Sequence, residues 1–160
     1  MKSQRVVRFR KALVAIVMGS ILGITTHAVA ATADTGWQLG GTFFSTPCYF
    51  SRAQAVTYPF TAIDFNGGLA DRQNSSGCYM SNTPEYMAGV NEDAWLYGYD
   101  GSYRVCASFS TSWSGDTVFV GQRYYPTGSC SSINLWGTQS SAYYGLADTY
   151  FNAWSGLTNW

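Results

Sequence analysis

Aromatic and aliphatic residues alternate with small or polar ones through most of residues 94–125, AWLYGYDGSYRVCASFSTSWSGDTVFVGQRYY. A period of two is typical of β-strands, because successive side chains of a strand point to opposite faces of the sheet. Asp100-Gly101 separates the first two alternating runs. Since a type I′ turn needs positive φ at both central positions, an Asp-Gly pair between such runs is a strong hairpin signal. The pattern predicts an antiparallel hairpin that turns at residues 100 and 101.

A two-residue turn places Tyr99 opposite Ser102, and every later pair of the hairpin follows from that one. One face then carries Leu96, Tyr103, Val105, Ala107 and Phe109, and we expect it to be core. The other face carries Trp95, Tyr97, Tyr99, Ser102, Arg104, Cys106 and Ser108. A second hairpin at residues 114–116, with Ser110 opposite Thr117, extends the prediction to a three-stranded meander in which Arg104 lies opposite Arg123.

The aromatic face of this meander has two interpretations. It is either the interior of a sandwich, where large rings pack against a second sheet, or an open platform that offers the rings of Trp95, Tyr97 and Tyr99 to a ligand. Two arginines directly opposite each other repel. Arg104 and Arg123 therefore indicate a carboxylate partner, an anionic ligand or a slipped strand.

The rest of the chain also favours short strands joined by turns. Strands are expected over residues 37–45, 56–65, 78–81 and 131–136, a turn at 66–68, a solvent loop at 71–77 and a short helix at 84–90. Residues 141–154 fit either a strand with a bulge or a short amphipathic helix. Together these patterns predict an all-β fold, a single disulfide-stabilised antiparallel β-sandwich or small barrel-like domain.

Residues 1–30 have the pattern of a secretory signal peptide. A basic start with Lys2 and Arg5 precedes an apolar stretch at 12–24, and small residues follow, with cleavage expected after Ala30 or Ala33. The apolar stretch is short for a membrane-spanning helix. We therefore expect residues 34–160 to form one β-rich domain that is secreted, extracellular or periplasmic, and not bound to a membrane after cleavage.

Removal of the signal changes the charge. Five of the nine basic residues and the single histidine, His27, lie within it, so the mature chain has four arginines, nine acids and no lysine, a net charge of 4 − 9 = −5. An acidic, lysine-free chain argues against nucleic acid or an anionic membrane as the main partner. Arginine-only usage also suggests a bacterial source.

The four cysteines predict two disulfides, because their number is even and the chain is expected to be exported. Sequential pairing, Cys48–Cys78 and Cys106–Cys130, is favoured since Cys130 follows soon after the strand expected to neighbour that of Cys106. A zinc site is disfavoured, because no Cys-x-x-Cys pair and no mature histidine are present.

The mature chain lacks two residue types on which many catalytic mechanisms depend. Without histidine or lysine, a Ser-His-Asp triad, a histidine base, a Schiff base and a histidine-ligated metal are excluded, and no cofactor is expected. Paired acids remain for a small glycoside hydrolase, with Asp64, Asp71, Glu85, Glu92 and Asp93 as candidates. Asn91, Glu92, Asp93 and Asp100 could instead form an oxygen-rich calcium site or simply cap loops.

These observations favour a secreted binding module over an enzyme. We expect it to bind a glycan by stacking sugar rings on Trp95, Tyr97 and Tyr99, with Arg104 and Arg123 holding hydroxyl or carboxylate groups. The alternative is a protein-targeting factor, an enzyme inhibitor or an antibacterial toxin, because tyrosine, tryptophan and arginine also dominate protein interfaces.

Overall fold

The computed structural model describes residues 30–42 and 47–160, which form ten β-strands and one short 3₁₀ turn. The predicted signal peptide lies outside this part of the chain except for Ala30. The elements are β1 (Ala31–Asp34), β2 (Gln38–Thr42), β3 (Pro47–Tyr58), β4 (Ala62–Gln73), β5 (Met87–Tyr99), β6 (Tyr103–Gly115), β7 (Thr117–Tyr124), η1 (Gly128–Cys130), β8 (Leu135–Tyr144), β9 (Thr149–Trp154) and β10 (Thr158–Asn159).

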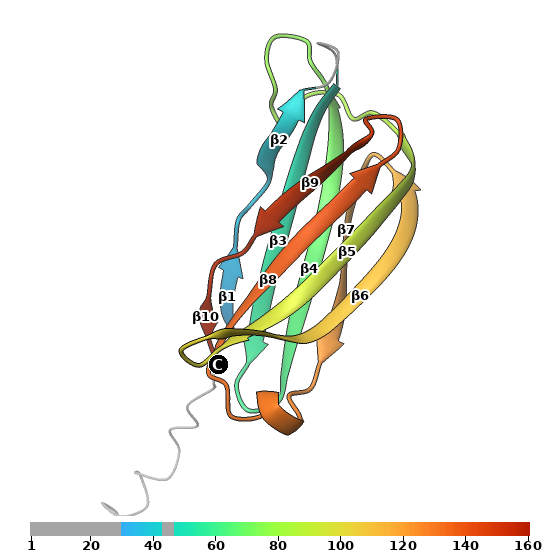
Figure 1. The fold of residues 1–160 in the computed structure, drawn as a ribbon. Helices are drawn as coiled ribbons and strands as arrows, with labels where there is room; N and C mark the ends of the chain where they lie inside the picture. Colours follow the sequence, from blue (N-terminus) through green and yellow to red (C-terminus); the bar gives the residue numbers. More distant parts are fainter. Residues whose placement is uncertain (1–29, 43–46) are drawn as a thin grey trace, which may run out of the picture.

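The strands form a β-sandwich of two five-stranded antiparallel sheets (Figure 1). The first sheet has the order β1-β3-β4-β7, and β2 also pairs with β3. The second has the order β10-β8-β5-β6, and β9 also pairs with β8. This architecture confirms the predicted all-β sandwich.

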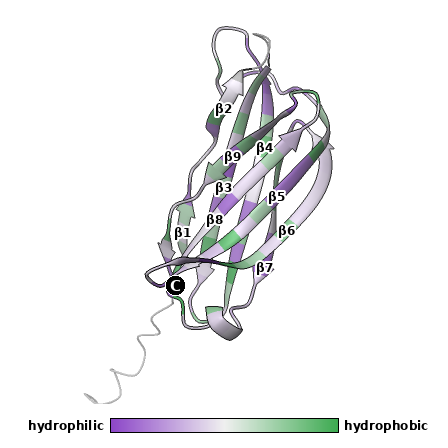
Figure 2. Ribbon diagram, in the orientation of Figure 1, coloured by the Kyte–Doolittle hydropathy of each residue, from purple (hydrophilic) through white to green (hydrophobic). Residues whose placement is uncertain are grey.

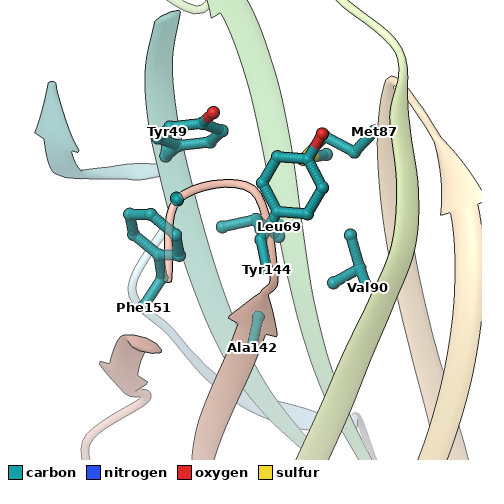
Figure 3. Packing of buried hydrophobic residues seen from close by; sticks show 8 residues of the cluster. Tyr49, Leu69, Met87, Val90, Ala142, Tyr144 and Phe151 are labelled. Carbon is teal, nitrogen blue, oxygen red and sulfur yellow. The ribbon is translucent and has the colours of Figure 1, made fainter. Parts of the chain in front are cut away.

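The core lies between the two sheets and is built from the alternate residues of each strand. In β5, Val90, Glu92, Ala94 and Leu96 are buried, whereas the residues between them are half-buried or exposed. Figure 2 shows hydrophobic and hydrophilic bands alternating along the strands. One cluster in the core joins Tyr49, Leu69, Met87, Val90, Ala142, Tyr144, Ala147 and Phe151 from both sheets (Figure 3). The prediction that Leu96 belongs to the core face is therefore confirmed.

The β5–β6 hairpin is present, but its predicted register is wrong. Tyr99 lies opposite Tyr103, across a three-residue turn in which Gly101 has φ +104°. Further along, a β-bulge lies where β6 passes from Val105, opposite Tyr97, to Ala107, opposite Leu96. A shift of one residue turns every side chain to the other face. Tyr103 and Val105 therefore join Tyr97 and Tyr99 on the outer face.

The second predicted hairpin is also wrong, because β6 and β7 belong to different sheets. β7 pairs with β4 instead, and Arg123 lies opposite Asp64 rather than Arg104. Arg72 on β4 contacts the segment where the chain changes sheet: its guanidinium donates to the Asp116 carbonyl (3.1 Å) and the Thr117 hydroxyl (2.6 Å). These bonds hold the start of β7 against β4.

The structure of the first sheet contradicts several predictions for short segments. Residues 66–68 are not a turn but the middle of β4, and the turn between β3 and β4 falls at residues 59–61. Gly67 is needed there for space, since a Cβ would lie 2.3 Å from the Glu92 Oε1 atom. Asp71 and Arg72, expected in a solvent loop, are buried at the end of β4.

Three further segments differ from expectation. Residues 78–81 form an irregular segment and a turn instead of a strand, and residues 84–90 contain no helix. β5 begins at Met87 instead, and Gly89 there has φ +69°, which a helix does not allow. Residues 141–154 complete β8, turn at 145–148 and form β9, so they are a hairpin.

Two disulfides are present in the sequential pairing, Cys48–Cys78 and Cys106–Cys130. The first ties the segment after β4 to β3 and covers part of the outer face of the first sheet. The second ties β6 to η1 at the edge of the core cluster around Trp136. The second disulfide thus anchors the strand that carries Tyr103.

Candidate ligand-binding site

The outer face of the second sheet carries most of the aromatic side chains singled out in the sequence. Trp95, Tyr97 and Tyr99 of β5 point outward and are half-buried. Tyr103 of β6 and Trp154 of β9 share this face and are 56% and 38% exposed. Rings packed inside a sandwich are normally almost fully buried. The aromatic face is therefore the open side of the sandwich rather than its interior.

Tyr97, Tyr103 and Trp154 form a compact triad on this face. The Tyr97 ring lies 5.7 Å from Trp154 and 6.4 Å from Tyr103, and Tyr103 lies 5.9 Å from Trp154, measured between centroids. All three pairs are close to perpendicular, which is a favoured geometry for aromatic contacts. The triad and Gln139 of β8 line a hollow of about 390 Å³, here called the aromatic hollow.

Local structure holds the Trp154 indole over the sheet. Gly137 of β8 lies beneath it, and a Cβ on this residue would come within 2.7 Å of the indole ring. Directly after Trp154, Ser155 exchanges two hydrogen bonds with Thr138: the Ser155 N–H donates to the Thr138 carbonyl (2.9 Å), and the Thr138 N–H donates to the Ser155 hydroxyl (2.8 Å). The end of β9 is therefore fixed against β8, so the indole has a defined position.

The aromatic residues predicted for the site lie together, although only one of them lines the hollow. Tyr97 is part of the hollow. Tyr99 packs on Tyr103, with ring centroids 4.8 Å apart, and so supports one wall. Trp95 lies opposite Gln139, one outward position further along β5.

Neither predicted arginine belongs to this surface. Arg104 points away from it and donates to the Asp100 carboxylate (2.7 Å) and the Ser129 carbonyl (3.2 Å), so it links the hairpin turn to η1. Arg123 lies on the first sheet, where it makes two hydrogen bonds to the Asp64 carboxylate at 2.6 and 2.7 Å. This pairing holds the pKa of Asp64 below its ordinary range.

Sequence reasoning missed Tyr103, Gln139 and Trp154. A two-residue turn at Asp100-Gly101 predicts Tyr103 on the core face, whereas the three-residue turn puts it on the outer face. Trp154 and Tyr150 alternate with buried Phe151 and Ala153, a strand pattern that was obscured because residues 141–154 also fit a helix. Read as a strand, that segment indicates an outward Trp154.

The acids considered for hydrolysis do not line the hollow. Glu92 is fully buried on the inner face of β5, where its Oε1 accepts a hydrogen bond from the Ser140 hydroxyl (2.6 Å). Burial raises the pKa of Glu92 to about 7, with a smaller contribution from Asp93. Burial beside Glu85 likewise raises the pKa of Asp71 to about 7, and this residue lies at the end of β4 in the first sheet.

The proposed calcium ligands do not come together either. Glu92 points inward, whereas the neighbouring Asn91 faces outward and accepts a hydrogen bond from Ser112. Asp100 lies at the hairpin turn and pairs with Arg104. Within residues 30–42 and 47–160, no three acids, cysteines or histidines are grouped as a metal site.

Comparisons with protein-family models, curated proteins and solved structures found no match to this chain. In the same described ranges, no helix is long and apolar enough to cross a membrane. Function is therefore inferred from the geometry of the aromatic hollow.

Proposed function

We propose that this protein is a secreted binding module that recognises a glycan through the aromatic hollow. The observation that carries the proposal is the grouping of Tyr97, Tyr103 and Trp154 around an open depression with one amide, Gln139, in its lining. Binding sites of this kind combine apolar and aromatic walls with a few polar groups that orient the ligand.

The chemistry of a sugar fits these four side chains. The C–H groups on one face of a pyranose ring pack on an aromatic ring, while its hydroxyls bond to polar groups at the edge. Gln139 offers both a donor and an acceptor, and the tyrosine hydroxyls can do either. None of the four side chains is charged at neutral pH, which favours a neutral sugar.

Two further observations support export. The two disulfides are typical of proteins that fold in an oxidising compartment. The sequence of residues 1–30 has the three parts of a secretory signal. Secretion, to the cell exterior or to a periplasm, is part of the proposal.

The first prediction tests the hollow directly. The oxidised domain is incubated with insoluble cellulose, chitin and xylan, and the bound fraction is measured for the wild type and for Trp154→Ala. Because one aromatic contact contributes about 0.5–1.5 kcal/mol beyond the apolar area it buries, we expect the substitution to weaken retention on the preferred polymer by about tenfold.

Tyr125→Ala provides the matched control. Tyr125 is likewise an exposed aromatic residue, at 61%, and follows β7 of the first sheet. We expect this variant to bind like the wild type. Retention on none of the three polymers, or equal retention of the wild type and Trp154→Ala, would overturn the proposal and favour a protein target instead.

A further inference from the structure

A second aromatic contact lies on the same outer face as the hollow. Tyr143 of β8 and Tyr150 of β9 are directly opposite each other, with ring centroids 4.9 Å apart. Tyr150 is 62% exposed, so its ring is accessible to a ligand. The Tyr143 hydroxyl donates to the Asp148 carboxylate (3.0 Å), which holds the Tyr143 ring in place.

The tyrosine pair and the hollow are aligned along the strands. Tyr150 and Trp154 lie four residues apart on β9, and both point outward. With a rise of about 3.3 Å per residue, their Cα atoms are roughly 13 Å apart. The two contacts are therefore too distant for one sugar ring and suit successive parts of a chain that lies along β8 and β9.

The surface between the two contacts is polar. Asn152 of β9 lies opposite Ser141 of β8, which in turn lies opposite Asp93 of β5. All three residues share the outward alternation of Trp154 and Gln139, so they form a row across the path of such a chain. Ser141 is buried, whereas Asn152 is exposed and Asp93 is half-buried. The Asn152 amide and the Asp93 carboxylate can therefore bond to sugar hydroxyls.

The charges beside β8 and β9 favour a neutral polymer over an anionic one. Asp93 lies in the row between the two contacts, and Asp148 lies at the tyrosine pair. The arginines that could balance a negative ligand are engaged elsewhere: Arg104 with Asp100 and Arg123 with Asp64. An anionic polymer, such as one made of uronic acids, would be repelled, whereas a neutral one would not.

We propose that the outer face of the second sheet binds the interior of a neutral linear polysaccharide, which lies along β8 and β9 from the aromatic hollow to the Tyr143–Tyr150 pair. This inference rests on the proposed glycan-binding function, and it further specifies that the glycan is a long and uncharged chain. It requires Tyr150 to contribute to the binding of long chains only.

The experiment measures affinity against chain length. The polymer that retains the protein, among cellulose, chitin and xylan, supplies the disaccharide and the hexasaccharide for calorimetric titration of the wild type, Tyr150→Ala, Tyr150→Phe and Trp154→Ala. We expect Tyr150→Ala to weaken hexasaccharide binding by roughly two- to tenfold and to leave disaccharide binding unchanged. Tyr150→Phe keeps the ring and should bind as the wild type does, and Trp154→Ala should weaken binding of both ligands.

The outcomes separate this inference from the function on which it rests. If Trp154→Ala weakens binding but Tyr150→Ala does not change hexasaccharide affinity, the extended path is wrong and the hollow remains a sugar site. Retention on polygalacturonate equal to that on the neutral polymer would also overturn the extended path. Failure of the wild type to bind any of the neutral polymers overturns both proposals. Thermal melting of each variant checks that it is folded.

Discussion

At the scale of single residues, the least expected feature is a glutamate in the centre of the sandwich. Glu92 is fully buried, and its Oε2 atom has no hydrogen-bond partner among the residues that the structure describes. A buried carboxylate is costly, because the interior solvates charge poorly, and the group responds by holding its proton. The stability of the whole domain should therefore depend on the ionisation of this one side chain.

The corresponding prediction concerns pH. The pKa of Glu92 is raised from its ordinary 4.5 to about 7, so the folded state holds a proton that the unfolded state releases between these values. The free energy of unfolding should fall as the pH rises through this window, with a contribution from Glu92 of about 3 kcal/mol. Urea unfolding at about pH 5 and about pH 8 measures the difference.

Glu92→Gln isolates this contribution. The amide can still accept the Ser140 hydrogen bond but carries no charge, so the variant should lose much less stability with rising pH than the wild type. The part that remains is expected from Asp71, whose raised pKa acts in the same direction. An unchanged pH dependence in Glu92→Gln would show that Glu92 does not hold its proton.

At the scale of elements, the β5–β6 hairpin positions one wall of the hollow, and a single covalent link fixes its free strand. β6 is an edge strand, with β5 as its sheet neighbour. Cys106 of β6 is bonded to Cys130, and Arg104 adds a hydrogen bond to Ser129 in the same loop. The position of Tyr103 should therefore depend on this disulfide more than on strand pairing alone.

Removing each disulfide in turn tests this dependence. The Cys106→Ser and Cys130→Ser double variant opens a connection of 24 residues, and the Cys48→Ser and Cys78→Ser control opens one of 30. Both should lose about 3 kcal/mol of stability in the chain-entropy model. Under conditions where both remain folded, we expect only the first to lose retention on polysaccharide. Equal retention by the two variants would contradict the anchoring role.

The same hairpin shows what the sequence could and could not predict. Alternation correctly indicated that Leu96 is core and that Tyr97 shares a face with Trp95 and Tyr99. It could not indicate the three-residue turn or the bulge near Cys106. Each of them adds one residue to β6 or its turn, so the residues of β6 still alternate, but the face to which they point changes at each of these places. For β7, alternation indicates which side chains point inward but not whether the neighbouring strand is β4 or β6.

At the scale of the whole molecule, the two outer faces differ in chemistry. The outer face of the first sheet carries paired charges: Arg52 bonds to Asp34 and lies over the rings of Trp37 and Phe119. Asp64 and Arg123 form a second pair there. The second sheet lies on the opposite side of the sandwich (Figure 1). Its outer face carries the uncharged aromatic hollow. The charged side chains named on the first face therefore bond to one another, whereas the aromatic rings of the second face are accessible to a ligand.

The first sheet also discriminates between the two cleavage sites expected for the predicted signal peptide. β1 begins at Ala31, pairs with β3 and ends at Asp34, which bonds to Arg52. Cleavage after Ala33 would remove three of the four residues of β1 and uncover that edge of β3, whereas cleavage after Ala30 preserves the strand. We therefore predict that the exported protein begins at Ala31, which its intact mass will show. A mature chain beginning at Asp34 would contradict this.

The Cys106–Cys130 link has a consequence for the cell that makes the protein. Thiols in a cytosol are kept reduced, so a newly made chain cannot close this link there. The strand that carries Tyr103 then lacks its covalent anchor, and one wall of the aromatic hollow is not fixed. If the protein is exported and binds a glycan, as we propose, completion of the binding surface is coupled to its passage out of the cytosol.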